Sequence, residues 1–462
     1  MDKLDIRIES ITIKNVKNVV NGTVELNNIL KDSHGASITG IYGQNGSGKT
    51  ALIWSFEILK DALSGVSLPE DAFFYIHQNN HTANICVDLS ILLNSRPYSV
   101  SYSLGLSKAL EKKSYISYEC LELSAKEFQN SPTIRKTKIL EVKNTANEEL
   151  NICGYGPEVR IAEMSSIDKQ AKQKLIVLQA LAKEKNSSYI FNDKMREFLK
   201  GSFNNTYYQI IEQLCFYARM NLFVLNKNSD TLFNMNLLPL SVRLSTQNYI
   251  TKADILPVGL SQNTTNETSF IIVKKIIHQI DILLQNIIPG LHVDIVEIAQ
   301  QLDKNGEKQI VFELVSKRNE LTTPLKYESE GIKKILCILS SLIAMYNNKS
   351  IFVAIDELDA GIFEYLLGEF LDVINKTGKG QLLFTSHNMR PLEVLDPANI
   401  CFTTTNPTNK YIKFTGVKTN NNLRTLLLRT IDLGGQKEPV YESTSSYQIG
   451  KAFRKAGALI NE

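Results

Sequence analysis

The chain has few cysteines, little net charge and no long apolar run. Its six cysteines are scattered over 462 residues without a Cys-x-x-Cys pair, which favours reduced core thiols over a zinc site or a disulfide framework. A net charge of +3 is too small to indicate a nucleic-acid or membrane partner by itself. No apolar run approaches membrane-spanning length, and the first residues, MDKLDIRIESITIKN, lack the apolar core of a signal peptide. We therefore expect a soluble, cytoplasmic protein.

A glycine-rich stretch carries the strongest signal. It matches the phosphate-loop pattern G-x-x-x-x-G-K-[ST] at every fixed position, with the residues Gly43, Gln44, Asn45, Gly46, Ser47, Gly48, Lys49 and Thr50. A β-type run at 37–42 precedes it and an apolar helical run at 51–59 follows. The glycines let consecutive N–H groups point at phosphate oxygens, Lys49 can reach the β- and γ-phosphates, and Thr50 offers a hydroxyl to Mg²⁺. The stretch predicts an ATP site with Mg²⁺ as cofactor.

Two carboxylates follow an apolar run at 350–355, which reads as a buried parallel strand. Ligands bind at the carboxyl ends of such strands. Asp356 is predicted to hold Mg²⁺, and Glu357 to act as the general base that deprotonates the attacking water. The alternative is an acidic pair that only caps a helix.

A second apolar run, 381–385, leads through Ser386 to His387. A lone histidine is more often structural than catalytic. Because His387 follows a core strand soon after the Asp-Glu strand, we interpret it as a sensor of the γ-phosphate that holds the attacking water.

Ser329, Glu330 and Gly331 precede an apolar helix predicted at 335–346. Ser329 is a good N-cap, and a helix start bearing Ser and Gly can bind phosphate. Since the phosphate loop already serves one face of the nucleotide, this second helix suggests a site shared between subunits. An ordinary capped helix is an equally good interpretation of this stretch alone.

The order of these motifs resembles the ABC-type ATPase heads of the SMC, RecF and OLD families, and is most similar to AAA15/AbiL-like (RloA-like) bacterial ATPases linked to phage defence. The resemblance rests on KNVKN, GQNGSGKT, ESEGIKK, IDELDAGI and LLFTSHN. It implies that Ser329, Glu330 and Gly331 form a signature that contacts the partner subunit's γ-phosphate. It also implies a D-loop aspartate at Asp359 and a switch histidine at His387. ESEG departs from the transporter signature LSGGQ, and Gln78 is only a candidate for the Q-loop glutamine.

The expected fold is an α/β P-loop NTPase of ABC-ATPase type with an antiparallel β-layer and a helical insertion. β-rich runs fill 83–124, helical periodicity fills 167–220, and the Asn-, Ser- and Thr-rich residues 226–268 are expected to contain loops. The predicted parts are an N-terminal ATPase lobe (1–153), a mainly helical insertion (154–240), a C-terminal ATPase lobe (241–415) and a tail (416–462).

Three functions remain open at this stage. The first is an ATP-hydrolysing sensor or regulator of an anti-phage, abortive-infection system, whose ATP-linked homodimer or higher oligomer controls a separate effector from a neighbouring gene, expected to be a nuclease. The second is a DNA-repair ATPase of RecF or SMC type that presents a basic surface to DNA; its candidates are Lys410, Lys413, Lys418, Arg424, Arg429, Lys451, Arg454 and Lys455. A transporter ATPase subunit fits least, because the β-layer and the helical insertion do not suit a short transporter cassette.

Overall fold

The computed structural model describes residues 5–26, 35–127, 132–144, 150–151, 169–202, 205–226, 237–245, 250–417 and 422–458. Cys153 and Lys418 lie outside these residues. Within the described ranges, no helix is long and apolar enough to cross a membrane.

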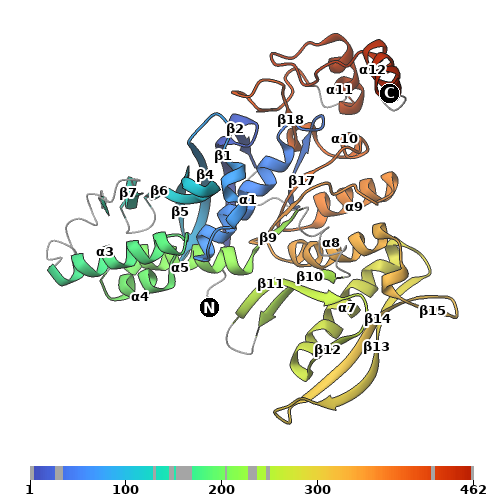
Figure 1. The fold of residues 1–462 in the computed structure, drawn as a ribbon, viewed down its shortest axis with the longest axis horizontal. Helices are drawn as coiled ribbons and strands as arrows, with labels where there is room; N and C mark the ends of the chain where they lie inside the picture. Colours follow the sequence, from blue (N-terminus) through green and yellow to red (C-terminus); the bar gives the residue numbers. More distant parts are fainter. Residues whose placement is uncertain are drawn as a thin grey trace.

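A six-stranded sheet forms the centre of the molecule, in the order β19-β18-β3-β17-β16-β9 (Figure 1). All its neighbours are parallel except the edge pair β18–β19. The strands are β3 (Ser37–Tyr42), β9 (Leu222–Leu225), β16 (Phe352–Ile355), β17 (Gln381–Thr385), β18 (Ile400–Thr403) and β19 (Tyr411–Ile412). Every residue of β3, β16 and β17 is buried, as predicted for strands covered on both faces.

Helices cover the two faces of this sheet. In β16, Phe352 and Ala354 join the apolar cluster that contains α1 (Lys49–Ser64), whereas Val353 and Ile355 join the cluster that contains α8 (Glu330–Asn347) and α9 (Glu364–Thr377). Alternation of side chains along a strand produces this division. The phosphate-loop helix therefore lies on one face and the Ser329 helix on the other.

The antiparallel β-layer is a seven-stranded sheet in the order β2-β1-β4-β5-β6-β7-β8, which confirms the prediction. Its strands are β1 (Asp5–Val16), β2 (Val19–Glu25), β4 (Thr82–Leu93), β5 (Arg96–Lys108), β6 (Ser114–Ala125), β7 (Ile134–Asn144) and β8 (Leu150–Asn151). The buried side chain of Gln381 joins the two sheets: its Oε1 accepts from the N–H of Ile8 (2.9 Å), and its Nε2 donates to the Ile8 carbonyl (2.8 Å).

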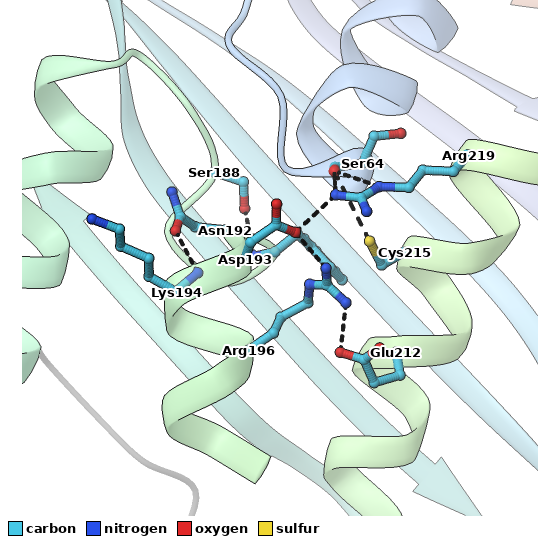
Figure 2. A network of polar contacts seen from close by, with 10 residues as sticks. Ser64, Ser188, Asn192, Asp193, Lys194, Arg196, Glu212, Cys215 and Arg219 are labelled. Carbon is cyan, nitrogen blue, oxygen red and sulfur yellow. Dashed lines mark hydrogen bonds and ion pairs between the residues drawn. The ribbon is translucent and has the colours of Figure 1, made fainter. Parts of the chain in front are cut away.

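The predicted helical run consists of α3 (Lys169–Glu184), α4 (Asp193–Ser202) and α5 (Asn205–Met220). Figure 2 shows how α4 and α5 meet the end of the phosphate-loop helix. Asp193 of α4 is hydrogen-bonded to Arg196 and to Arg219 of α5 (3.0 Å), and the Nε of Arg219 donates to the Ser64 carbonyl at the last turn of α1 (3.0 Å). The insertion is thus anchored to α1 by charge-assisted hydrogen bonds.

The described part of 226–268, which was expected to contain loops, is formed largely by strands. A hairpin of β10 (Leu237–Ser245) and β11 (Ile250–Gly259) is followed by β12 (Asn263–Asn266). Leu238 and Leu240 are fully buried beside α8. The composition of the whole segment concealed these strands, whose stability comes from cross-strand pairing and from a helix much further along the chain.

A second small sheet and a long helix complete this half of the chain. The sheet has the order β12-β14-β13, with β15 also paired to β14. It lies at the opposite end of the molecule from α3 and α4 (Figure 1). The elements are α7 (Glu267–Ile287), β13 (Leu291–Leu302), β14 (Lys308–Arg318) and β15 (Leu321–Pro324).

Short helices occupy the C-terminal region and several connections. The α-helices are α10 (Pro391–Val394), α11 (Leu423–Leu433) and α12 (Ser446–Ala458). The 3-10 helices are η1 (Glu70–Tyr75), η2 (Leu110–Lys112), η3 (Leu325–Tyr327) and η4 (Pro397–Asn399).

Candidate nucleotide site

The phosphate loop connects the buried strand β3 to α1, which begins at Lys49. Gly48 is the N-cap residue in a left-handed conformation (φ 104°), and Gly46 also has positive φ (74°). A Cβ at Gly43 would lie 1.7 Å from Oγ1 of Thr403, so no other residue fits there. The loop therefore needs its glycines for conformation at two positions and for space at the third.

Lys49 is 6% exposed and points back into its own loop. Its Nζ donates to the carbonyls of Gly43 (2.7 Å) and Gln44 (3.0 Å). Phosphate oxygens are stronger acceptors for an ammonium than neutral carbonyls. The side chain is thus held at the start of the loop, where a terminal phosphate could replace one of these carbonyls.

Three polar side chains from outside the loop support it, and the sequence motifs predicted a role for none of them. The Asn18 amide, from the β1–β2 turn, donates to the Gly46 carbonyl. The Tyr411 hydroxyl donates to the Gly48 carbonyl (2.8 Å), and Oγ1 of Thr403 donates to Oγ of Ser47 (2.7 Å). Asn18 belongs to the KNVKN stretch that marks the family resemblance, whereas Thr403 and Tyr411 carry no recognisable sequence signal.

The predicted acidic pair follows β16, two strands from β3 in the sheet, with β17 between them. Asp356 is 6% exposed, and its Oδ1 accepts a hydrogen bond from Oγ1 of Thr385 (2.6 Å). Its Oδ2 is buried without a hydrogen-bond partner in the structure. A buried carboxylate oxygen without a donor suits a cation, so Asp356 together with Thr50 at the start of α1 fits a Mg²⁺ site.

Glu357 has a left-handed backbone (φ 50°) that a glutamate rarely adopts. Its N–H donates to Oγ1 of Thr385 (2.8 Å), and its carbonyl accepts from Nζ of Lys334 on α8 (2.8 Å). The strained turn is therefore held from β17 and from α8. Such strain is common at functional sites, because the surroundings must enforce it.

Asp359 organises the turn that carries His387. Its Oδ2 accepts from the backbone N–H groups of His387 (3.1 Å) and Asn388 (3.0 Å). The His387 side chain is exposed. The structure thus brings the predicted base, the D-loop aspartate and the switch histidine to one edge of the sheet, the edge from which the phosphate loop starts.

The predicted signature begins α8, as expected. Ser329 is the N-cap, and its Oγ accepts from the N–H of Ile332 (3.3 Å). A Cβ at Gly331 would lie 2.4 Å from the Gly361 carbonyl, so the helix start packs directly on the turn after Asp359. Ser329 and Glu330 are exposed, and the contacts described for these three residues are with α8 and Gly361 rather than with the phosphate loop.

Gln78 lies on an exposed loop between η1 and β4. The N–H of His77 in this loop donates to the Asn15 carbonyl (2.8 Å), and Nδ2 of Asn80 donates to Oδ1 of Asn15 (2.9 Å). The loop therefore packs on the end of β1, next to the β1–β2 turn from which Asn18 supports Gly46. Among the described contacts, no hydrogen bond joins the Gln78 side chain to the phosphate loop.

The candidate basic surface needs one correction. Lys410 is 5% exposed, so it cannot belong to a surface that faces DNA. Arg424 lies 3.1 Å from a Glu393 carboxylate oxygen and is partly neutralised. Arg429, Lys451, Arg454 and Lys455 are exposed.

A comparison with protein families matches residues 7–390 to AAA_15, described as an AAA ATPase domain. The chain belongs to this family. With the phosphate loop at the end of β3, this AAA_15 protein is an α/β P-loop ATPase with an antiparallel β-layer and a helical insertion. No curated protein matches it.

Solved structures that resemble this AAA_15 protein share little sequence with it. The SmcHead bound to the C-winged helix domain of ScpA is 13% identical, with a TM-score of 0.45, over 88% of this chain and 98% of that chain. The SMC head domain from Thermotoga maritima is 13% identical, with a TM-score of 0.35, over 88% and 99%. The recombination mediator RecF bound to ATP is 12% identical, with a TM-score of 0.35, over 83% and 94%.

Proposed function

We propose that the protein hydrolyses ATP at the edge of the central sheet where the phosphate loop, Asp356 and Glu357 meet. The observation that carries this proposal is the buried, unpartnered Oδ2 of Asp356 beside a strained Glu357, two strands from the phosphate loop. Buried polar atoms are normally satisfied, and an unsatisfied carboxylate oxygen at the same edge of the sheet as the phosphate loop suits a bound cation.

Each side chain has a role in this proposal. Lys49 binds the β- and γ-phosphates after it leaves its loop carbonyls. Thr50 and Asp356 would hold Mg²⁺, which would supply positive charge to the phosphates. Glu357 accepts a proton from the water that attacks the γ-phosphorus, and the bond to the β–γ bridging oxygen breaks to give ADP and phosphate. His387 holds that water and senses the γ-phosphate.

We further propose that two chains share each nucleotide, as an ATP-linked dimer. Ser329 and Glu330 are exposed at the start of α8, and Gly331 packs on Gly361 beside the D-loop aspartate. A helix start that is open to solvent can offer its N–H groups to the γ-phosphate bound by a partner subunit. Hydrolysis would then separate the two chains, which makes the dimer a switch.

The biological role that we propose is regulation in an anti-phage, abortive-infection system. The dimer controls an effector protein, a nuclease encoded by a neighbouring gene. Support comes from the motif resemblance to AAA15/AbiL-like ATPases and from membership of the AAA_15 family. Co-purification of the neighbouring gene product with the ATP-bound protein, and its loss after hydrolysis, would test this role.

A DNA-repair ATPase of RecF or SMC type is the second candidate. The exposed Arg429, Lys451, Arg454 and Lys455 favour it. It requires DNA binding that weakens steeply with salt. Charge reversal of these four residues should then abolish DNA binding without changing ATPase activity measured in the absence of DNA.

Two variants test the ATPase proposal. Lys49→Ala should lose ATP binding and turnover, because the phosphates lose their principal cation. Glu357→Gln should bind ATP, lose about 10²- to 10⁴-fold in turnover, and accumulate an ATP-bound dimer during size-exclusion chromatography. Glu369→Gln, on the exposed side of α9, is the matched control and should behave as wild type. Wild-type hydrolysis by Glu357→Gln would remove Glu357 from its role.

A further inference from the structure

A buried lysine without an anionic partner lies beside the last glycine of the phosphate loop. Lys410, which directly precedes β19, is 5% exposed. Its N–H donates to the Asn21 carbonyl (3.1 Å), and its carbonyl accepts from the N–H of Thr404 (2.9 Å), so its backbone is fixed on both sides. Within the described part of the chain, no acceptor takes a hydrogen bond from its Nζ. Burial lowers the pKa of this ammonium, and no carboxylate opposes that shift.

Two close approaches define the course of the Lys410 side chain. A Cβ built on Gly22 of β2 would lie 3.1 Å from Cβ of Lys410. A Cβ built on Gly48 would lie 3.3 Å from its Cε. The stem therefore runs from β2 to the phosphate loop, and its charged end lies next to the residue where the loop becomes α1. The neighbouring Tyr411 hydroxyl fixes the carbonyl of that same Gly48 (2.8 Å).

We propose that Lys410 is a second phosphate-binding lysine, which neutralises the α-phosphate end of the nucleotide while Lys49 serves the β- and γ-phosphates. The two ammonium groups lie at opposite ends of the loop: Lys49 at Gly43 and Gln44, and Lys410 at Gly48. The backbone between them cradles phosphates, and the α-phosphate lies toward the helix start. This inference rests on the proposed ATP site, because without a nucleotide the lysine has no such ligand.

The energetics favour a ligand for this site. A largely buried lysine without a counter-charge is unfavourable for a fold, because its ammonium loses part of its hydration and gains no ion pair. An oxyanion that binds beside it restores the lost interaction, and a charge-assisted hydrogen bond of this kind corresponds to about 10- to 100-fold in affinity. Contact with the α-phosphate would favour ATP and ADP equally, since both carry that group.

The test compares Lys410→Met with Lys413→Met. Methionine keeps most of the apolar stem and removes the charge, and Lys413 is a half-buried lysine of the same segment. Binding of ATP and of ADP is measured by calorimetry on the full chain, and melting temperatures are recorded with and without ADP. We expect Lys410→Met to weaken ATP and ADP binding by the same factor, about 10- to 100-fold. We also expect it to leave the ligand-free melting temperature unchanged or higher, while Lys413→Met matches wild type in every assay.

Two results would overturn the assignment of Lys410. One is ADP affinity within about twofold of wild type, which is also the outcome if the lysine pairs instead with a carboxylate of a partner subunit. The other is a lower ligand-free melting temperature together with an unchanged ADP-induced rise, which is the signature of a structural lysine. Failure of the wild-type protein to bind ATP or ADP would instead overturn the proposed ATP site, and the inference with it.

Discussion

The Thr385 hydroxyl offers a sharp test of how the acidic pair is built, because one oxygen serves two neighbouring residues. Oγ1 of this fully buried threonine donates to Oδ1 of Asp356 (2.6 Å) and accepts from the N–H of Glu357 (2.8 Å). Thr385→Val keeps the shape of the side chain and removes both hydrogen bonds. Each buried group left unsatisfied costs about 1–3 kcal/mol, and the carboxylate lies toward the upper end. We therefore expect a loss of about 2–5 kcal/mol in the free energy of unfolding.

The same substitution should impair ATP turnover more than it impairs nucleotide binding. Asp356 and the strained Glu357 turn would lose the contact that orients both, whereas Lys49 and the phosphate loop would be unchanged. Urea unfolding measures the stability, and phosphate release at saturating ATP measures turnover.

Thr385→Ser is the matched control for this test. It keeps the hydroxyl and loses one methyl group, so it should retain most of the activity and cost only about 1 kcal/mol. Equal defects in the serine and valine variants would show that packing, rather than the shared hydroxyl, is what matters at this position.

Two further predictions concern the shared site and the phosphate-loop helix. Lys49→Ala and Ser329→Arg should each inactivate the homodimer. A mixed dimer of the two variants keeps one shared site with both motifs intact, so mixing them should restore up to about half of the wild-type hydrolysis per dimer. A mixed dimer that forms but neither binds nor hydrolyses ATP would exclude the contact in trans. On α1, burial and the neighbouring Glu57 carboxylate raise the pKa of Asp61 from 3.8 to about 7. The folded state therefore favours the protonated carboxyl, so the stability that this group contributes is complete below about pH 4 and is lost as the pH rises through 7. Asp61→Asn should therefore flatten the pH dependence of the melting temperature between pH 4 and pH 7, and an unchanged dependence would contradict this assignment.

Local sequence was sufficient for the elements whose chemistry lies within one short stretch. The phosphate loop, the Asp-Glu strand and the capped start of α8 each combine a residue pattern with the element that it requires, over fewer than 30 residues. Apolar runs likewise predicted the buried parallel strands, because a strand covered on both faces needs apolar side chains at successive positions.

Strand pairing decided what local sequence left open. Asn, Ser and Thr are frequent in 226–268 as a whole, yet the leucine-rich β10 and its partner β11 form a hairpin whose Leu238 and Leu240 pack beside α8. Strands of this kind depend on partners far along the chain, which the composition of a long segment does not record.

Only the tertiary structure brought together the side chains that support the site. Thr403 and Tyr411 reach the phosphate loop across more than 350 residues of sequence, and Thr385 reaches Asp356 from the adjacent strand. Lys410 shows the difference most clearly. In the sequence it is one of several basic residues near the C-terminus, and in the fold it is a buried charge beside Gly48. The amino-acid sequence alone determined which chemical groups this protein has. Which of these groups are buried, and which lie close together, was decided by the tertiary structure, because burial and long-range proximity depend on how the sheets and helices pack.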